Sequence, residues 1–168
     1  MTDGYKGHGY FRVPSGQNVV DVRMPIDATL YEGSVHLSSD EPSYLLFFRT
    51  ACEGLWFRFD HIREPVPAIV ELFTDDPPAG SRTYPVGPLQ FKEADLIGTS
   101  IGSLGDGNAF VDFGIVDNFR RLPTPQHPNG QSLAPNAVCF YDFFDPDTEA
   151  YLRSVVHTGL LAEEALCP

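Results

Sequence analysis

The most aromatic stretch of the sequence ends in a histidine beside a carboxylate. GLWFRFDHIREP, residues 54 to 65, runs through tryptophan and phenylalanine to the adjacent Asp60 and His61. Such a pair can act as an acid and base in catalysis, hold a metal ion, or form a hydrogen-bonded polar end where a strand leaves the core. The three interpretations stay open on these residues alone.

A second carboxylate lies in an apolar run further along the chain. Asp112 stands in AFVDFGIVD, residues 109 to 117, and alternation puts it on one strand face with Phe110 and Gly114. A charge among apolar side chains must be paired or solvated. Asp112 is therefore a second candidate site residue beside His61. The remaining histidines of the later chain are interpreted as surface or capping residues: His36, His127 and His157.

The elements that must position these residues read as short strands. Runs rich in β-branched or aromatic residues, each bounded by Gly, Pro, Asp or Ser, recur about every ten residues, which favours an all-β sandwich or barrel. They are residues 19–24, 34–37, 44–48, 55–59, 68–73, 89–92 and 109–116. Within 55–59, Phe57 and Phe59 share one strand face and Arg58 marks the other, more polar one.

Two Pro-rich connections and one helix complete the chain. Residues 73–88 and 121–136 are longer than ordinary connections, and such loops are either binding rims or surface excursions. A helix is predicted over about 146–158, because Asp145 can cap it and Pro146 suits its first position. Its apolar residues recur on one face and are expected to pack on the sheet: Tyr151, Leu152, Val155 and Val156.

Length and charge restrict the class of protein. The 168 residues are the usual size of one domain, and a hydrophobic fraction of 42% is typical of a packed globular chain. The net charge of -12 argues against nucleic acid or an anionic membrane surface as partner. No apolar run reaches the roughly 18 residues of a membrane span, so no membrane insertion is expected. The first ten residues lack the apolar stretch of a secretory signal.

Cysteine spacing and short motifs exclude several chemistries. Cys52, Cys139 and Cys167 form no C-x-x-C pair, which excludes a zinc ribbon and leaves open either reduced thiols or one disulfide with one free thiol. The Gly-rich segment at 100–107 reads as a turn and not as a phosphate-binding loop. A phosphocarrier-like domain with His61 as acceptor would need a second histidine nearby, and the sequence places none there.

Four segments, in order, resemble a known family. They are VRMPIDATLYEGSV (22–35), LWFRFDHI (55–62), LQFKEADLIGTSIG (89–102) and AFVDFGIVD (109–117). Together they resemble the lysostaphin and LytM-type zinc endopeptidase domain, a duplicated hybrid motif. The resemblance implies a sandwich of antiparallel β-sheets with its site in a groove across one sheet. It also implies that the strand of His61 lies beside the strand of Asp112, so we predict that the His61 ring lies within a few ångströms of the Asp112 carboxylate, as a neutralising pair or a small-ligand site. It also implies that His61 matches the histidine that helps activate water or hold the transition state, and that Asp95, Ile97 and Gly98 match a Gly-Asp-x-Ile-Gly turn.

The zinc-ligand positions of that family are degenerate in this chain. The family binds zinc through His-x-x-x-Asp near the start and through the second histidine of a final His-x-His strand. Here the best register puts Lys6 and Tyr10 at the first pair and Phe110-Val111-Asp112 at the final strand. Catalytic zinc needs three protein ligands and one open position, and neither lysine at neutral pH nor phenylalanine supplies a ligand. His61, Asp112 and His8 are the remaining candidate ligands.

We therefore expect one domain, residues 1–168, with an all-β, lysostaphin-like core over about 6–117, either an antiparallel β-sandwich or a barrel-sandwich hybrid. The Pro-rich loop 121–136 and a C-terminal α-helix follow. The expected function is a metal-less, peptidase-like binding or regulatory module without a cofactor. It would recognise a bacterial cell-wall glycan or peptide, or a protein partner, in a groove around His61 and Asp112. The alternative is a metal-dependent peptidoglycan endopeptidase that binds zinc through substituted ligands such as Asp112, Asp60 and His61. The resemblance implies an extracytoplasmic location.

Overall fold

The computed structural model describes residues 8–14, 16–38, 41–73, 82–103, 107, 109–119 and 136–155. The chain divides into two compact units. The larger unit is Tyr10–Phe113, and the smaller joins Met1–Gly9 to Gly114–Pro168. The boundary falls inside strand β8 (Phe110–Asp117). The single domain expected from the sequence stays a prediction.

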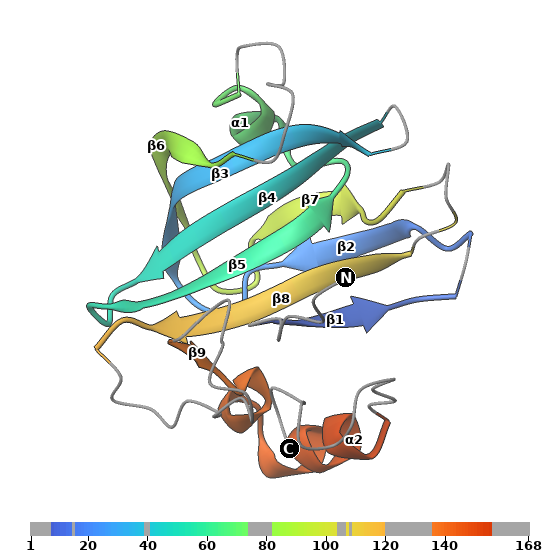
Figure 1. Ribbon diagram of the computed structural model, residues 1–168, viewed down its shortest axis with the longest axis vertical. Coiled ribbons are helices and arrows are strands. Elements are labelled where there is room, and N and C mark those ends of the chain that lie inside the picture. The colour runs from blue at the N-terminus through green and yellow to red at the C-terminus, as the bar shows by residue number, and fades with distance from the viewer. Residues whose placement is uncertain are drawn as a thin grey trace, which may run out of the picture. The chain divides into compact units, whose positions relative to one another are not determined.

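The larger unit is built from β-sheet (Figure 1). Its strands are β1 (Gly9–Arg12), β2 (Val19–Arg23), β3 (Ala28–Ser38), β4 (Glu41–Thr50), β5 (Leu55–Ile62), β6 (Tyr84–Phe91), β7 (Leu96–Ser100) and the start of β8. The main sheet has the order β1-β8-β5-β4-β3-β6, and a second sheet pairs β2 with β7. Strand β3 pairs antiparallel with β4 and β6, and β4 with β5. The expected antiparallel, all-β fold with a C-terminal helix is confirmed.

Aromatic residues gather on one face of the main sheet. Phe48, Phe57, Phe59 and Phe113 are all buried there, at most 6% exposed. The rings of Phe48 and Phe57 stack with centroids 5.3 Å apart, and those of Phe59 and Phe113 are 5.0 Å apart. Because each ring buries on the order of 150–250 Å², this cluster forms the core of the unit. The predicted alternation is confirmed, since Arg58, between two buried phenylalanines, is only half-buried.

The second sheet contains a strand absent from the sequence predictions. Residues 96–100, in the segment matched to a Gly-Asp-x-Ile-Gly turn, form β7. Ala94, just before it, has a φ of 66°, the left-handed conformation that favours glycine. A Cβ on Gly98 would lie 2.8 Å from Ile62 Cγ2 and 3.2 Å from the Glu64 carbonyl oxygen. Glycine therefore permits β7 to approach the end of β5.

The predicted strand over residues 68–73 is wrong. Pro67–Val70 forms the short helix α1, and a proline stands in its first turn, where a missing N–H costs no helical hydrogen bond. Ile69 and Phe73 are buried whereas Val70 is exposed. Glu71, which a strand would place on the same face as Ile69 and Phe73, is exposed, whereas a spacing of four also suits one face of a helical turn. A short apolar run fits either structure, and here the proline favours the helix.

In the smaller unit, β9 (Ala137–Val138) pairs with the end of β8 and precedes the 3-10 helix η1 (Phe140–Phe143) and helix α2 (Pro146–Val155). Asp145 caps α2 as predicted, because its Oδ1 accepts hydrogen bonds from the backbone N–H groups of Asp147 and Thr148. Arg153 joins α2 to η1 through an ion pair with Asp142 at 2.7 Å. The expectation that Tyr151 packs on the sheet is wrong, since it is 64% exposed and the helix is anchored through Arg153 instead.

The state of the cysteines decides between the two alternatives left open by the sequence, reduced thiols or one disulfide with one free thiol. Cys139 is disulfide-bonded, and Cys52 is a free, exposed thiol. Three reduced cysteines are therefore excluded.

Several sequence predictions concern residues outside the described part of the chain. These are residues 121–135 of the second Pro-rich loop, the helix beyond Val155, and Lys6, His127, His157 and Cys167. The first Pro-rich loop ends earlier than expected, because β6 begins at Tyr84. Among the described residues, no helix is both long and apolar enough to cross a membrane.

Candidate functional site

The face of the main sheet opposite the aromatic core, here called the polar face, carries the candidate residues. Neighbours across antiparallel strands share a face. His36 on β3 lies opposite Ser43 on β4, and Arg58 on β5 lies opposite Phe47 on β4. Asp112 on β8 stands between two core residues of its strand, so alternation directs it to the same polar face.

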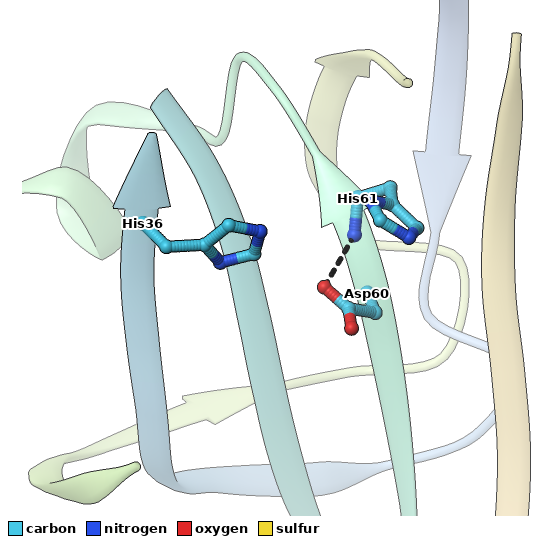
Figure 2. A group of neighbouring side chains, drawn as sticks. All are labelled: His36, Asp60 and His61. Atoms are coloured by element: carbon cyan, nitrogen blue, oxygen red, sulfur yellow. Dashed lines mark hydrogen bonds between the residues drawn. The ribbon is translucent and has the colours of Figure 1, made fainter. Parts of the chain in front are cut away.

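A β-bulge at the end of β5 brings Asp60 and His61 to this face together. The register of β5 against β4 shifts here, so that both residues stand opposite Leu45. His61 has a φ of 65°, a left-handed conformation that is unusual for histidine. Its backbone N–H donates a hydrogen bond to Asp60 Oδ1 at 2.8 Å (Figure 2). Because adjacent side chains of a regular strand point to opposite faces, the bulge permits these two to act on one ligand.

His36, Asp60 and His61 form a group of possible metal ligands, here called the His–Asp–His group (Figure 2). One ligand atom from each residue lies within 4.8 Å of the others, and all three residues are half-buried. The two imidazole rings are 6.4 Å apart between centroids and close to perpendicular, at 75°. The expectation that no second histidine lies near His61 is therefore wrong.

Asp112 lies beside the His–Asp–His group. His61 Nε2 and Asp112 Oδ2 are 3.8 Å apart, and the two side chains are 27% and 10% exposed. The ring of Phe110 meets the His61 ring edge-on, with centroids 4.8 Å apart, and restricts how the imidazole turns. The predicted proximity of His61 and Asp112 is confirmed. Its cause is the pairing of β5 with β8 in the main sheet.

Arg58 brings a positive charge to the same face. Burial lowers the pKa of its guanidinium, and the nearby Asp60 and Asp112 carboxylates oppose that shift. Two carboxylates against one guanidinium leave a net negative charge on this part of the polar face when the histidines are neutral. The electrostatic balance therefore favours a cation or a ligand with a cationic group.

Buried polar atoms without partners surround His36. Among the described residues, His36 Nδ1, Ser34 Oγ and Ser43 Oγ are buried and make no hydrogen bond. Ser34 and Ser43 are 0% and 2% exposed, and both share the face of His36, one by alternation on β3 and one as its cross-strand neighbour. An unpaired buried polar group costs about 1–3 kcal/mol. A water molecule or an ion is one partner that can satisfy such atoms.

The other candidate ligands from the sequence are not in this group. His8 lies within the described part of the chain and is not a member of the His–Asp–His group. Tyr10 on β1 is 58% exposed, and its ring lies 5.6 Å from that of Phe110 between centroids. Tyr10, at a position that the family resemblance assigns to zinc binding, therefore packs its ring near that of Phe110, in the final strand of the resemblance.

His36 is the residue that sequence reasoning missed, since it was interpreted as a surface or capping residue. A signal existed: the short connection between the runs at 34–37 and 44–48 favours a hairpin, which pairs His36 with a residue near Ser43. Its approach to His61 depends on the bulge in β5, which no sequence pattern indicates, because plain alternation would turn His61 to the face opposite Asp60.

Comparisons with models of known protein families, with curated proteins and with solved structures find no match for this chain. The fold therefore defines the class of this chain, an antiparallel β-sheet protein with a C-terminal helix. The polar face and the residues on it are the basis for proposing a function.

Proposed function

We propose that this protein is a binding module that recognises a bacterial cell-wall peptide or glycan on the polar face around His61 and Asp112, without cleaving it. The observation that carries the proposal is the close approach of His61 and Asp112, 3.8 Å apart, with Arg58 and Asp60 nearby. Imidazole, carboxylate and guanidinium groups together offer both donors and acceptors to a polar ligand.

Aromatic side chains flank these polar groups and support a binding role. Phe47 and Trp56 have ring centroids 5.3 Å apart, and both share the face of Arg58. Phe110 contacts His61 on the other side. Apolar and aromatic surface with a few convergent polar groups is the usual composition of a ligand site. The combination suits a chain of sugars or amino acids that carries charged and apolar parts.

Binding without cleavage is inferred from the residues at the family's zinc positions. Tyr10 and Phe110 pack ring against ring in this chain. A phenylalanine ring offers no lone pair, so a zinc ion of the family kind lacks a ligand there. The resemblance to lysostaphin and LytM-type domains thus supports recognition of a cell-wall ligand more than its hydrolysis.

The disulfide at Cys139 supports an extracytoplasmic location. Disulfides form and persist in oxidising compartments and are rare where glutathione keeps thiols reduced. Cell-wall ligands are encountered in the first kind of compartment.

A metal-dependent peptidoglycan endopeptidase is the second candidate, and one observation favours it. The His–Asp–His group offers two imidazoles and a carboxylate, the same number of protein ligands as a catalytic zinc site. Two of its members, Asp60 and His61, are among the substituted ligands expected from the sequence. Release of peptide fragments from cell wall separates this candidate from the first.

The test is co-sedimentation of the full chain with purified, insoluble peptidoglycan. Asp112→Asn keeps the shape of the side chain and removes its charge, and Glu71→Gln makes the same charge change at an exposed site outside the polar face. Because hydrogen bonds to charged groups are worth about 1.5–3 kcal/mol, we expect Asp112→Asn to weaken binding at least about tenfold. Glu71→Gln should bind like the unchanged protein.

Three results would contradict the proposal. Unchanged protein that stays in the supernatant has no affinity for the cell wall, and equal affinity of both variants would mean that the polar face is not the binding surface. Release of soluble peptides from the pellet, measured as new amino groups, would replace the binding module by the endopeptidase.

A further inference from the structure

We propose that the His–Asp–His group of His36, Asp60 and His61 binds a divalent transition-metal ion of the zinc type, with Asp112 positioning the His61 imidazole from behind. The inference goes beyond the proposed function, because its three ligands lie outside the family's zinc positions and it needs no cell-wall ligand. Its test can fail while cell-wall binding holds, and the reverse.

The spacing of the ligand atoms is the first support. Zinc lies about 2.0–2.2 Å from nitrogen and oxygen ligands, which places ligand atoms of a tetrahedral site about 3.3 Å apart. The three ligand atoms of the group are within 4.8 Å of one another. The remaining distance is small enough for side-chain rotation to close, with His36 on β3 and with Asp60 and His61 on β5 each moving a part of it.

The chemistry of the donors selects the class of ion. Two imidazoles and one carboxylate suit zinc, iron, nickel or cobalt, whereas calcium and magnesium prefer oxygen ligands alone. Three protein ligands leave at least one position for water or for an oxygen of a bound ligand. All three residues are half-buried, so solvent reaches the site and an ion can enter.

Unpaired buried atoms are the second and independent support. His36 Nδ1 makes no hydrogen bond within the described residues, and the hydroxyl of its cross-strand neighbour Ser43, a residue 2% exposed, is also unpaired. A metal ion with its bound water supplies a partner to a ring nitrogen and to nearby hydroxyl groups. Without an occupant these atoms bear an uncompensated desolvation cost.

Charge and second-layer contacts are the third support. Metal-bound histidines commonly hold their other ring nitrogen against a carboxylate, which fixes the orientation of the ring. Asp112 Oδ2 stands 3.8 Å from His61 Nε2, longer than a hydrogen bond, and would take this relation once His61 bound the ion through Nδ1. Arg58 opposes the ion, because its positive charge interacts with both Asp60 and Asp112. Removal of this charge should therefore strengthen metal binding.

The experiment is a calorimetric titration of the metal-free full chain with zinc ion alone. It is carried out in Cys52→Ser, because the exposed Cys52 thiol is itself a zinc ligand. We expect one ion per chain. His36→Gln and Asp60→Asn should each weaken binding by more than about 100-fold, since loss of a second-layer partner alone costs about 10–100-fold. Asp112→Asn should fall within that second-layer range, and Arg58→Gln should bind more tightly.

His8→Gln is the matched control, because His8 is a histidine outside the group and should leave the affinity unchanged. A second measurement, by NMR on the protein with all its histidines intact, keeps the test valid if a histidine variant fails to fold. On addition of zinc, the ring NMR signals of His36 and His61 should shift together and that of His8 should not.

Three results would overturn the metal site: no zinc binding at millimolar concentration, wild-type affinity in His36→Gln, or a zinc-induced shift at His8 without one at His36.

Discussion

The left-handed backbone of His61 gives the sharpest test of how the polar face is built. Its φ of 65° is part of the bulge that puts His61 beside Asp60. The perturbation is a pair of substitutions at the same position, His61→Gly and His61→Ala. Both remove the imidazole and all its contacts, so the difference between them isolates the backbone.

The expected difference follows from two opposing effects. An L-residue in the left-handed region costs about 1–2 kcal/mol relative to glycine. Glycine in a strand costs about 0.5–1 kcal/mol relative to alanine through the entropy of the unfolded chain. At φ of 65° the first effect is the larger, so His61→Gly should be the more stable variant by about 0.5–1 kcal/mol. The control pair is Arg58→Gly and Arg58→Ala, in the regular part of the same strand. Only the second effect acts there, so Arg58→Ala should be the more stable of the two.

The assay is urea unfolding of all four variants, followed through the fluorescence of Trp56, the one tryptophan of the chain. Midpoints are compared at equal slopes, because a change in slope reports the unfolded state instead. The two positions should give differences of opposite sign. If alanine is the more stable residue at position 61 as well, then the backbone there is not left-handed, and the bulge does not create the His–Asp–His group.

Two further predictions concern the turn before β7 and the cap of α2. Ala94→Gly should raise the free energy of unfolding by about 0.5–1 kcal/mol, because the φ of Ala94 is 66°; the same change at Ala68, an exposed residue of helix α1, should lower it in the same urea assay. A loss of stability in both variants would contradict the reasoning. The pKa of Asp145 is lowered from its ordinary value of 3.8, chiefly by a hydrogen bond with the Thr148 side chain. A depressed pKa means that this carboxylate stabilises the helix above pH 3.8 and loses its effect as the pH falls through the lower, folded value. The helical circular dichroism signal should therefore decline more in acid for the unchanged protein than for Asp145→Asn. Equal acid profiles would mean that the charge of Asp145 does not stabilise the helix.

Local pattern alone determined much of the fold. Alternation along the run at 55–59 predicted which of Phe57 and Arg58 faces the core, because side chains of a regular strand change sides at every residue. The start of helix α2 was equally predictable, since Asp145 and Pro146 act on the N–H groups of the following turn. Where a local signal was ambiguous the prediction failed, as at 68–73, where a short apolar run became helix α1.

The candidate site was only partly predictable. The convergence of His61 and Asp112 was inferred from the family resemblance and from the need to pair a carboxylate among apolar residues, and the contact is present at 3.8 Å. His36 entered the site through tertiary structure alone. It stands 24 residues before Asp60 in the sequence, and the two meet because β4 holds β3 and β5 in register. A bulge then turns His61 to the face that alternation already gives to Asp60. Strand register and bulges arise from the summed packing of several strands. The side-chain pattern of any one strand therefore determines which residues face the core, and the assembled sheet decides which polar residues meet.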